Sequence, residues 1–227
     1  MRLDPLPRLT STLGKALGNP RLLVFAIVMS KLCLDRVYKF ALAVNPTPAL
    51  DNGGNQTIDI LEYYHPSTAS DVYRHLDSYN LKQRLAYQSL AIFDSGFVVF
   101  RAIPIAFMIC WAFKTAPAKY QPGIWVVLVN VFADLLENIL ITILLKSYPE
   151  RLPFIAQALT WVIDIKWKSF WGMLGLLFVA MLAGIYFSFH AMLANSVLLE
   201  KDRKDKQRAR QHVNQVMDRA GSSRDGA

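Results

Sequence analysis

Four polar residues interrupt a stretch of the chain that is otherwise apolar enough to lie in hydrocarbon. The run 123–145 is long enough to cross a bilayer, yet it contains Asn130, Asp134, Glu137 and Asn138. Their spacing of four, three and one residues places all four on one side of a helix. Charge in the middle of a membrane is costly, and it is usually retained where it faces a bundle interior or a water-filled path. This stripe is therefore the strongest candidate for a functional site.

Charged residues also interrupt two neighbouring apolar runs. Asp94 and Arg101 are seven residues apart in one of them and share a helix face. In the other, Asp35 lies four residues from both Lys31 and Lys39, a spacing that permits ion pairing along one helix face. We therefore expect mutual neutralisation among these charges rather than a pore lined by one sign of charge.

The elements that position these residues are predicted to be membrane-spanning helices. Hydrophobic residues make up 53% of the 227-residue chain. Four apolar runs approach or exceed the roughly 20 residues needed to cross about 30 Å of hydrocarbon. We therefore expect an all-α polytopic membrane protein with four transmembrane helices, at about 21–44, 90–113, 123–145 and 169–193.

The distribution of basic residues predicts the orientation. Fourteen Lys and Arg lie up to the start of the first span at Arg21, between the second and third spans, or after the fourth, against seven on the opposite side. The positive-inside rule then places both termini in the cytosol. The expected organisation is a cytosolic segment 1–20, a membrane domain 21–199 that begins with a retained signal anchor, a lumenal loop 45–89 within it, and a basic cytosolic tail 200–227.

Two lumenal features are expected. Ser70 is a candidate N-cap for a helix from Asp71 that forms a short helical hairpin over 71–88 and covers the outer mouth of the bundle. A separate interfacial segment, 147–168, precedes the fourth span. Asn55-Gln56-Thr57 is a glycosylation sequon, so Asn55 is a candidate glycosylation site.

Placing the polar residues at these depths predicts an intramembrane cleft that opens toward the lumen and closes near Asp134. Helix adhesion through buried polar contacts remains an alternative explanation. The candidate catalytic residues are Asp134, Glu137 and Asn138. The candidate ligand-binding residues are Asp35, Asp94, Arg101, Asn130, Asp134, Glu137 and Asn138.

Several classes of function lack support in the sequence. The four histidines are scattered, without the spacing of a metal site, and we find no phosphate-binding loop or dinucleotide fingerprint. We therefore expect no metal and no cofactor. The basic tail lacks interleaved aromatic residues, so we expect no nucleic-acid partner, whereas its eight cations suit anionic lipid.

A set of short motifs resembles an uncharacterised group of small four-span integral membrane proteins. The motifs are Leu76-Asp77-x-Tyr79, Arg84-x-x-Tyr87, Phe93-Asp94, Asp134-x-x-Glu137-Asn138 and a following lysine, Lys166 or Lys168. The resemblance covers about residues 70–195. This chain departs from the group in Arg101 and in its long basic tail. The resemblance implies the four-span fold and supplies no activity.

Three functions remain open. The first is a non-enzymatic protein of the endoplasmic reticulum or another secretory membrane that binds a lipid or a partner membrane protein through the cleft. The second is an intramembrane enzyme acting on a lipid or isoprenoid, with Asp134 and Glu137 as an acid–base pair. The third is a proton-coupled carrier that uses the same carboxylates as a homo-oligomer.

Overall fold

The computed structural model describes residues 3–45, 60–114 and 116–222, and every regular element in these ranges is helical. This confirms the all-α fold. The elements in chain order are α1 (Pro7–Leu17), α2 (Pro20–Val44), α3 (Leu61–Tyr64), α4 (Ala69–Ser78), α5 (Leu81–Ala112), the 3₁₀ helix η1 (Ala118–Tyr120), α6 (Trp125–Ser147) and α7 (Pro153–Ser222).

Three to four of these helices are long and apolar enough to cross a membrane. Three pass individually: α5, the stretch Ala118–Ser147 that contains α6, and α7 over Pro153–Arg208. The fourth is α1 and α2 taken together as one span with a bend of 88°. The four charged residues between 31 and 39 make α2 less apolar than the others.

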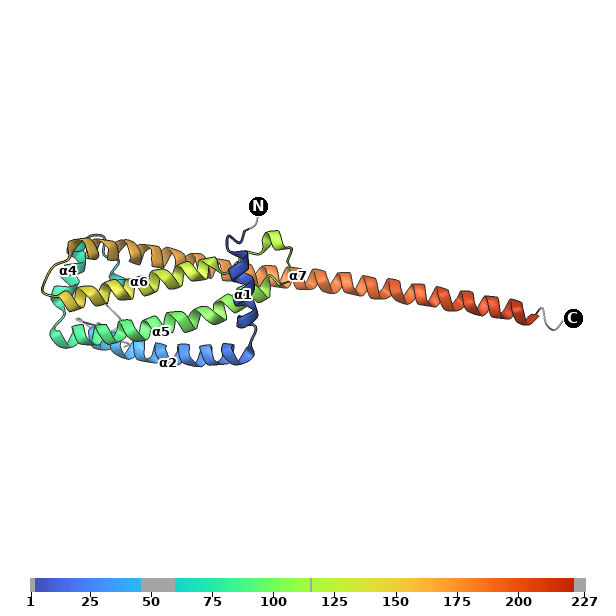
Figure 1. The fold of residues 1–227 in the computed structure, drawn as a ribbon, viewed down its shortest axis with the longest axis horizontal. Helices are drawn as coiled ribbons and strands as arrows, with labels where there is room; N and C mark the ends of the chain where they lie inside the picture. Colours follow the sequence, from blue (N-terminus) through green and yellow to red (C-terminus); the bar gives the residue numbers. More distant parts are fainter. Residues whose placement is uncertain (1–2, 46–59, 115, 223–227) are drawn as a thin grey trace, which may run out of the picture.

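Four helices, α2, α5, α6 and α7, run side by side along the bundle, and α1 crosses them near one end (Figure 1). α5 packs against α2, α6 and α7. Its contact with α2 is close at Gly96: a Cβ added there would lie 3.1 Å from Cys33 Sγ, so a larger residue would not fit without a shift. Phe40 stacks on Phe93 in the same interface, with ring centroids 5.6 Å apart.

Apolar side chains gather in two clusters, one at each end of the bundle. One cluster includes Leu90 of α5, Ile141 of α6 and Ile163 of α7. The other includes Ala106 of α5, Val127 of α6 and Met173 of α7. On each of these three helices the polar residues fall between the two clusters. The fold therefore holds a polar layer between two apolar ones.

The predicted hairpin is made of α4 and the first turns of α5. Thr68, rather than Ser70, is the N-cap of α4: its hydroxyl accepts a hydrogen bond from the Asp71 amide while the Asp71 carboxylate accepts one from the Thr68 amide. The second arm is not a separate helix, because α5 begins at Leu81 and continues through the bundle. Tyr79 and Tyr87 are each only 1% exposed, so this region packs on the bundle.

α7 differs most from expectation. The predicted interfacial segment 147–168 and the predicted span 169–193 are not separated by a break, because one helix runs from Pro153 to Ser222. Its C-terminal part projects beyond the bundle at the end where α1 lies, and α4 lies at the other end (Figure 1). A continuous α7 directs the side chain of Lys166 toward α6.

Candidate functional site

Lys166 is the centre of a buried ion-pair network. Its Nζ lies 2.5 Å from Glu62 Oε2, 2.9 Å from Asp134 Oδ1 and 2.9 Å from Glu137 Oε2. Glu62 belongs to α3, and the other two carboxylates lie one helical turn apart on α6. All four side chains are 13% exposed or less. One ammonium group from α7 therefore holds three carboxylates from two other elements.

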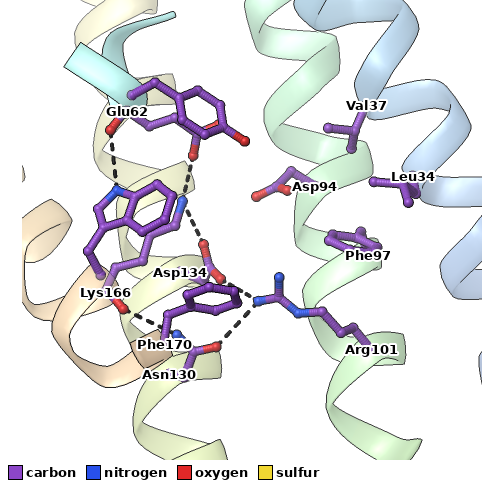
Figure 2. A pocket seen from close by; sticks show the side chains of 12 residues that line it. Leu34, Val37, Glu62, Asp94, Phe97, Arg101, Asn130, Asp134, Lys166 and Phe170 are labelled. Carbon is purple, nitrogen blue, oxygen red and sulfur yellow. Dashed lines mark hydrogen bonds and ion pairs between the residues drawn. The ribbon is translucent and has the colours of Figure 1, made fainter. Parts of the chain in front are cut away.

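Arg101 of α5 extends the network from the other side. Its Nη2 donates to Asp134 Oδ2 at 3.0 Å and to Asn130 Oδ1 at 3.3 Å (Figure 2). Its guanidinium also lies over the Phe97 ring, 4.9 Å from the centroid. Asn130 in turn donates to Ser169 Oγ at 3.2 Å on α7. Asp134 thus has a cation on each carboxylate oxygen and links α5, α6 and α7.

Asp94 is bonded to an amide rather than to a cation. Asn138 Nδ2 donates to Asp94 Oδ2 at 2.8 Å, and Asp94 forms no ion pair within the described part of the chain. Figure 2 shows its carboxylate pointing from α5 toward the space between α5 and the Lys166 network. One acidic side chain therefore faces this space without a positively charged partner.

These side chains surround a cavity of about 150 Å³, which we call the polar cavity. A water molecule occupies about 30 Å³ in the liquid, so the cavity has room for a small polar group. Leu34 of α2 and Tyr63 of α3, which are 41% and 51% exposed, form its rim. The cavity is lined by Leu34, Val37, Glu62, Tyr63, Asp94, Phe97, Arg101, Asn130, Asp134, Lys166, Trp167 and Phe170.

Six of the seven predicted ligand-binding residues come together here. Four of them, Asp94, Arg101, Asn130 and Asp134, line the cavity. Two more lie directly behind its wall: Glu137 contacts Lys166, and Asn138 contacts Asp94. The three candidate catalytic residues, Asp134, Glu137 and Asn138, are therefore all part of the network or adjoin it.

Asp35 is the exception and lies outside the polar cavity. Its carboxylate pairs with Lys31, and both side chains are more than half exposed. The reason is the register of α2 on α5. Cys33 faces Gly96 of α5. Asp35 follows Cys33 by two residues, so its side chain points about 200° around the helix from that contact. The helix face that carries Asp35 is therefore turned away from the bundle.

Eight of the twelve lining residues are not among the predicted ligand-binding residues, and four of these, Glu62, Tyr63, Lys166 and Trp167, form the side of the cavity toward α3 and α7. The sequence places Lys166, which the resemblance names, and Trp167 in a lumenal segment, although the apolar spacing of Ile155, Leu159 and Ile163 continues into them and indicates a helix with the same buried face. Glu62 and Tyr63 come from a four-residue helix, for which the sequence offers no periodic signal. Asn55, the candidate glycosylation site, lies outside the described residues.

Burial beside Glu62 affects the phenol of Tyr63. Desolvation, followed by the negative charge of Glu62, raises the pKa of Tyr63 above its ordinary value of 10.0. Tyr63 is therefore a neutral hydroxyl at physiological pH. Its ring lies 5.8 Å from that of Trp167, so the rim of the cavity carries a pair of aromatic faces.

Comparisons with protein-family models, curated proteins and solved structures find no match to this chain. The resemblance to small four-span membrane proteins therefore stays a prediction. Among the described residues, no group of three His, Cys, Asp or Glu side chains is placed to hold a metal ion. The geometry of the polar cavity is thus the main guide to function.

Proposed function

We propose that this chain is a non-enzymatic membrane protein that binds a lipid through the polar cavity. The observation that carries the proposal is the composition of the cavity wall. Charged groups from α3, α5, α6 and α7 converge on one space, while its rim is formed by exposed apolar and aromatic side chains, Leu34 and Tyr63. A lipid has the same two parts, a polar headgroup and an apolar body.

The position of the cavity along the helices supports a headgroup site. Lys166 lies three residues before the predicted start of the fourth span at 169, the level where headgroups meet hydrocarbon. Trp161 and Trp171 are 64% and 65% exposed on α7 on either side of it. Exposed tryptophans favour the membrane–water interface. Asp134, which Lys166 contacts, is the middle residue of the predicted span 123–145, so the cavity extends from this interface toward the middle of the membrane.

The proposal includes the orientation and the membrane. Both termini are cytosolic, the cavity opens on the lumenal side, and the protein resides in the endoplasmic reticulum or another secretory membrane, with Asn55 glycosylated. Two arguments support this orientation. One is the fourteen-to-seven distribution of Lys and Arg. The other is that α1 and the extension of α7 lie at the same end of the bundle, which agrees with both termini being on one side of the membrane.

A second candidate, the proton-coupled carrier, is favoured by one observation. Glu137 is buried, its Oε2 lies 2.9 Å from the Lys166 ammonium, and its Oε1 has no hydrogen-bond partner within the described residues. A buried carboxyl group with one unpaired oxygen is suited to take up and release a proton. The enzyme hypothesis has less support, since a cation already occupies each oxygen of Asp134 and a substrate has no free oxygen to approach.

Photolabelling tests the lipid-binding proposal. The full chain is reconstituted in vesicles that contain a phosphatidylcholine with a diazirine on its acyl chain, and labelled peptides are mapped after illumination. We expect labelling around the cavity rim. Leu34→Trp should block the entrance and remove most of that labelling. Leu32→Trp is the matched control, because Leu32 is exposed on the same helix but does not line the cavity.

The other outcomes separate the competing functions. Rim labelling that Leu34→Trp leaves unchanged means that the lipid does not enter the cavity, and the proposal fails. Proton-dependent solute flux into liposomes that Glu137→Gln abolishes supports the carrier instead. Conversion of an added lipid by the purified chain supports an enzyme.

A further inference from the structure

We infer that the polar cavity selects a headgroup that carries an ammonium group, as zwitterionic phospholipids do. This inference rests on the lipid binding proposed above and specifies its chemistry. It follows from three features of the cavity: its balance of charge, its aromatic faces, and the order in which its charged groups lie along α5.

The charge balance is the first feature. Among the described residues, the network and the cavity wall contain four carboxyl groups, those of Glu62, Asp94, Asp134 and Glu137, and two cationic groups, those of Lys166 and Arg101. Lys166 and Arg101 both pair with Asp134, and Lys166 also pairs with Glu62 and Glu137. A site with more carboxyl groups than cations favours a positively charged ligand, because such a ligand stabilises the ionised form of those carboxyls, and it disfavours an anionic one.

Asp94 shows where that ligand binds. Among the described residues its hydrogen-bond partner is neutral, the Asn138 amide at 2.8 Å, whereas a cation pairs with each of the other three carboxylates. It also lines the cavity, as does Glu62, which belongs to another element. An ammonium group between Asp94 and Glu62 gains two opposite charges without displacing Lys166.

The aromatic rings are the second feature. The cavity wall contains Tyr63, Phe97, Trp167 and Phe170. The guanidinium of Arg101 already lies over Phe97 and Phe170, at 4.9 and 5.6 Å from their centroids. Tyr63 and Trp167 remain, and they adjoin Glu62, whose carbonyl oxygen accepts a hydrogen bond from Trp167 Nε1. Aromatic faces beside a carboxylate are the usual means of binding an organic ammonium ion.

The order of the groups along α5 is the third feature. Arg101 lies two turns from Asp94, about 10 Å along the helix axis. Its Nη2 donates to Asn130 and Asp134, and Arg101 also lines the cavity, so its guanidinium is the cationic group on the α5 side with which a phosphate would pair. In the proposed orientation Arg101 is the deeper group and Asp94 the outer one. A phospholipid of the lumenal leaflet presents phosphate and ammonium in this same order.

The test compares headgroups that differ in charge. Four photoactivatable lipids with identical acyl chains are offered to the full chain in vesicles: phosphatidylethanolamine, phosphatidylcholine, phosphatidylglycerol and diacylglycerol. We expect the two ammonium lipids to label the cavity rim about tenfold more than the anionic and the uncharged lipid, the ratio that 1.4 kcal/mol produces. Equal labelling by all four overturns the headgroup inference while leaving lipid binding intact. Labelling that does not reach the cavity overturns both.

Two matched pairs of variants test the residues. Tyr63→Ala should lower labelling by the ammonium lipids about two- to fivefold, as loss of one aromatic face does. Tyr64→Ala is its control, because Tyr64 is equally exposed on α3 but does not line the cavity. Asp94→Asn should reduce the preference for ammonium lipids over phosphatidylglycerol about tenfold, whereas Asp164→Asn, an exposed acid paired with Lys168, should not.

Folding and ligand source have their own readouts. Gel filtration and thermal unfolding show whether each variant is folded. If Asp94→Asn does not fold, Tyr63→Ala still tests the inference, because Tyr63 is half exposed and its truncation leaves the bundle interior intact. Competition with soluble phosphocholine at millimolar concentration tests whether the headgroup alone suffices: displacement of the lipid shows that the cavity also accepts a soluble ammonium ligand, and retention shows that binding requires the acyl chains of a membrane lipid. A preference for phosphatidylglycerol in the unmodified chain contradicts the inference outright.

Discussion

Asp134 and Glu137 lie one turn apart on α6, and both contact Lys166, but their surroundings differ. Asp134 has a cation at each oxygen, 2.9 Å away for Lys166 and 3.0 Å away for Arg101. Within the described residues Glu137 is paired with Lys166 alone, through Oε2, and its Oε1 has no hydrogen-bond partner. Asp134 is therefore a structural link between three helices, whereas Glu137 links α6 to α7 alone.

This difference predicts opposite responses to nearly isosteric substitutions. Asp134→Asn removes the charge that Arg101 and Lys166 share, and we expect it to lower the free energy of unfolding by about 3 kcal/mol. Glu137→Gln removes an excess charge while Lys166 keeps two carboxylates, so we expect a change within about 1 kcal/mol. Thermal unfolding of both variants in one detergent measures the contrast. Equal destabilisation would contradict the assigned roles.

At the scale of the elements, close contacts between helices set the geometry of the bundle. α7 meets α5 at Gly184, where a Cβ would lie 3.3 Å from the Cα of Ala112. Small residues at such crossings allow helices in membranes to approach closely. This contact holds α7 in place at one end of the bundle, as the Lys166 network does within it.

Enlarging Gly184 should therefore separate the helices. We expect Gly184→Leu to cost about 1–3 kcal/mol of stability, the usual penalty for overpacking a contact. Gly175→Leu, on the same helix, should be neutral, because a Cβ at Gly175 meets nothing within 4 Å. Unfolding midpoints of the two variants provide the measurement. A larger loss for Gly175→Leu would show that α7 packs through a different face.

The capping box of α4 predicts a pH dependence outside the membrane spans. The Thr68 hydroxyl donates to the Asp71 carboxylate at 2.8 Å, and this bond is the largest cause that lowers the pKa of Asp71 below 3.8. The carboxylate therefore stabilises α4 fully above pH 3.8, and this contribution is lost as the pH falls through the lower folded pKa. A ¹³C NMR titration should give an Asp71 midpoint below 3.8, and Thr68→Ala should return it toward 3.8.

At the scale of the whole molecule, the polar layer lies between two apolar clusters along three helices. Such an arrangement suits a membrane protein, because the apolar clusters close the bundle on both sides of the charged network. Beyond Phe178, α7 carries many large apolar side chains that are more than half exposed, as expected for a helix that faces lipid. The polar extension then follows, with ion pairs such as Lys204–Glu200 at 2.7 Å.

The proposed orientation has a direct test at this scale. A reporter fused after Ala227 should read cytosolic, and a tag inserted near Gly53 should be protected from protease in sealed microsomes. Asn55→Gln should remove any glycan-dependent shift in mobility. Cleavage of the Gly53 tag from the cytosolic side would reverse the topology and would place the polar cavity on the cytosolic side.

The sequence by itself determined the all-α membrane class and the stripe from Asn130 to Asn138. Both are local properties: hydropathy depends on composition over about 20 residues, and the helical repeat dictates which neighbours share a face. The polar side of α6 can therefore be predicted from the sequence alone. So was the pairing of Lys31 with Asp35, which lie four residues apart on one helix.

Only the tertiary structure decided what that stripe contacts. Lys166 and Glu62 are 104 residues apart in the chain, and no periodic pattern in the sequence predicts their contact. Asp35 carries the same type of charge as Asp94, but it points outward because Cys33 and Gly96 determine which face of α2 packs on α5. Helix rotation and the pairing of distant segments depend on the fit of side chains across interfaces, and neither composition nor spacing encodes that fit.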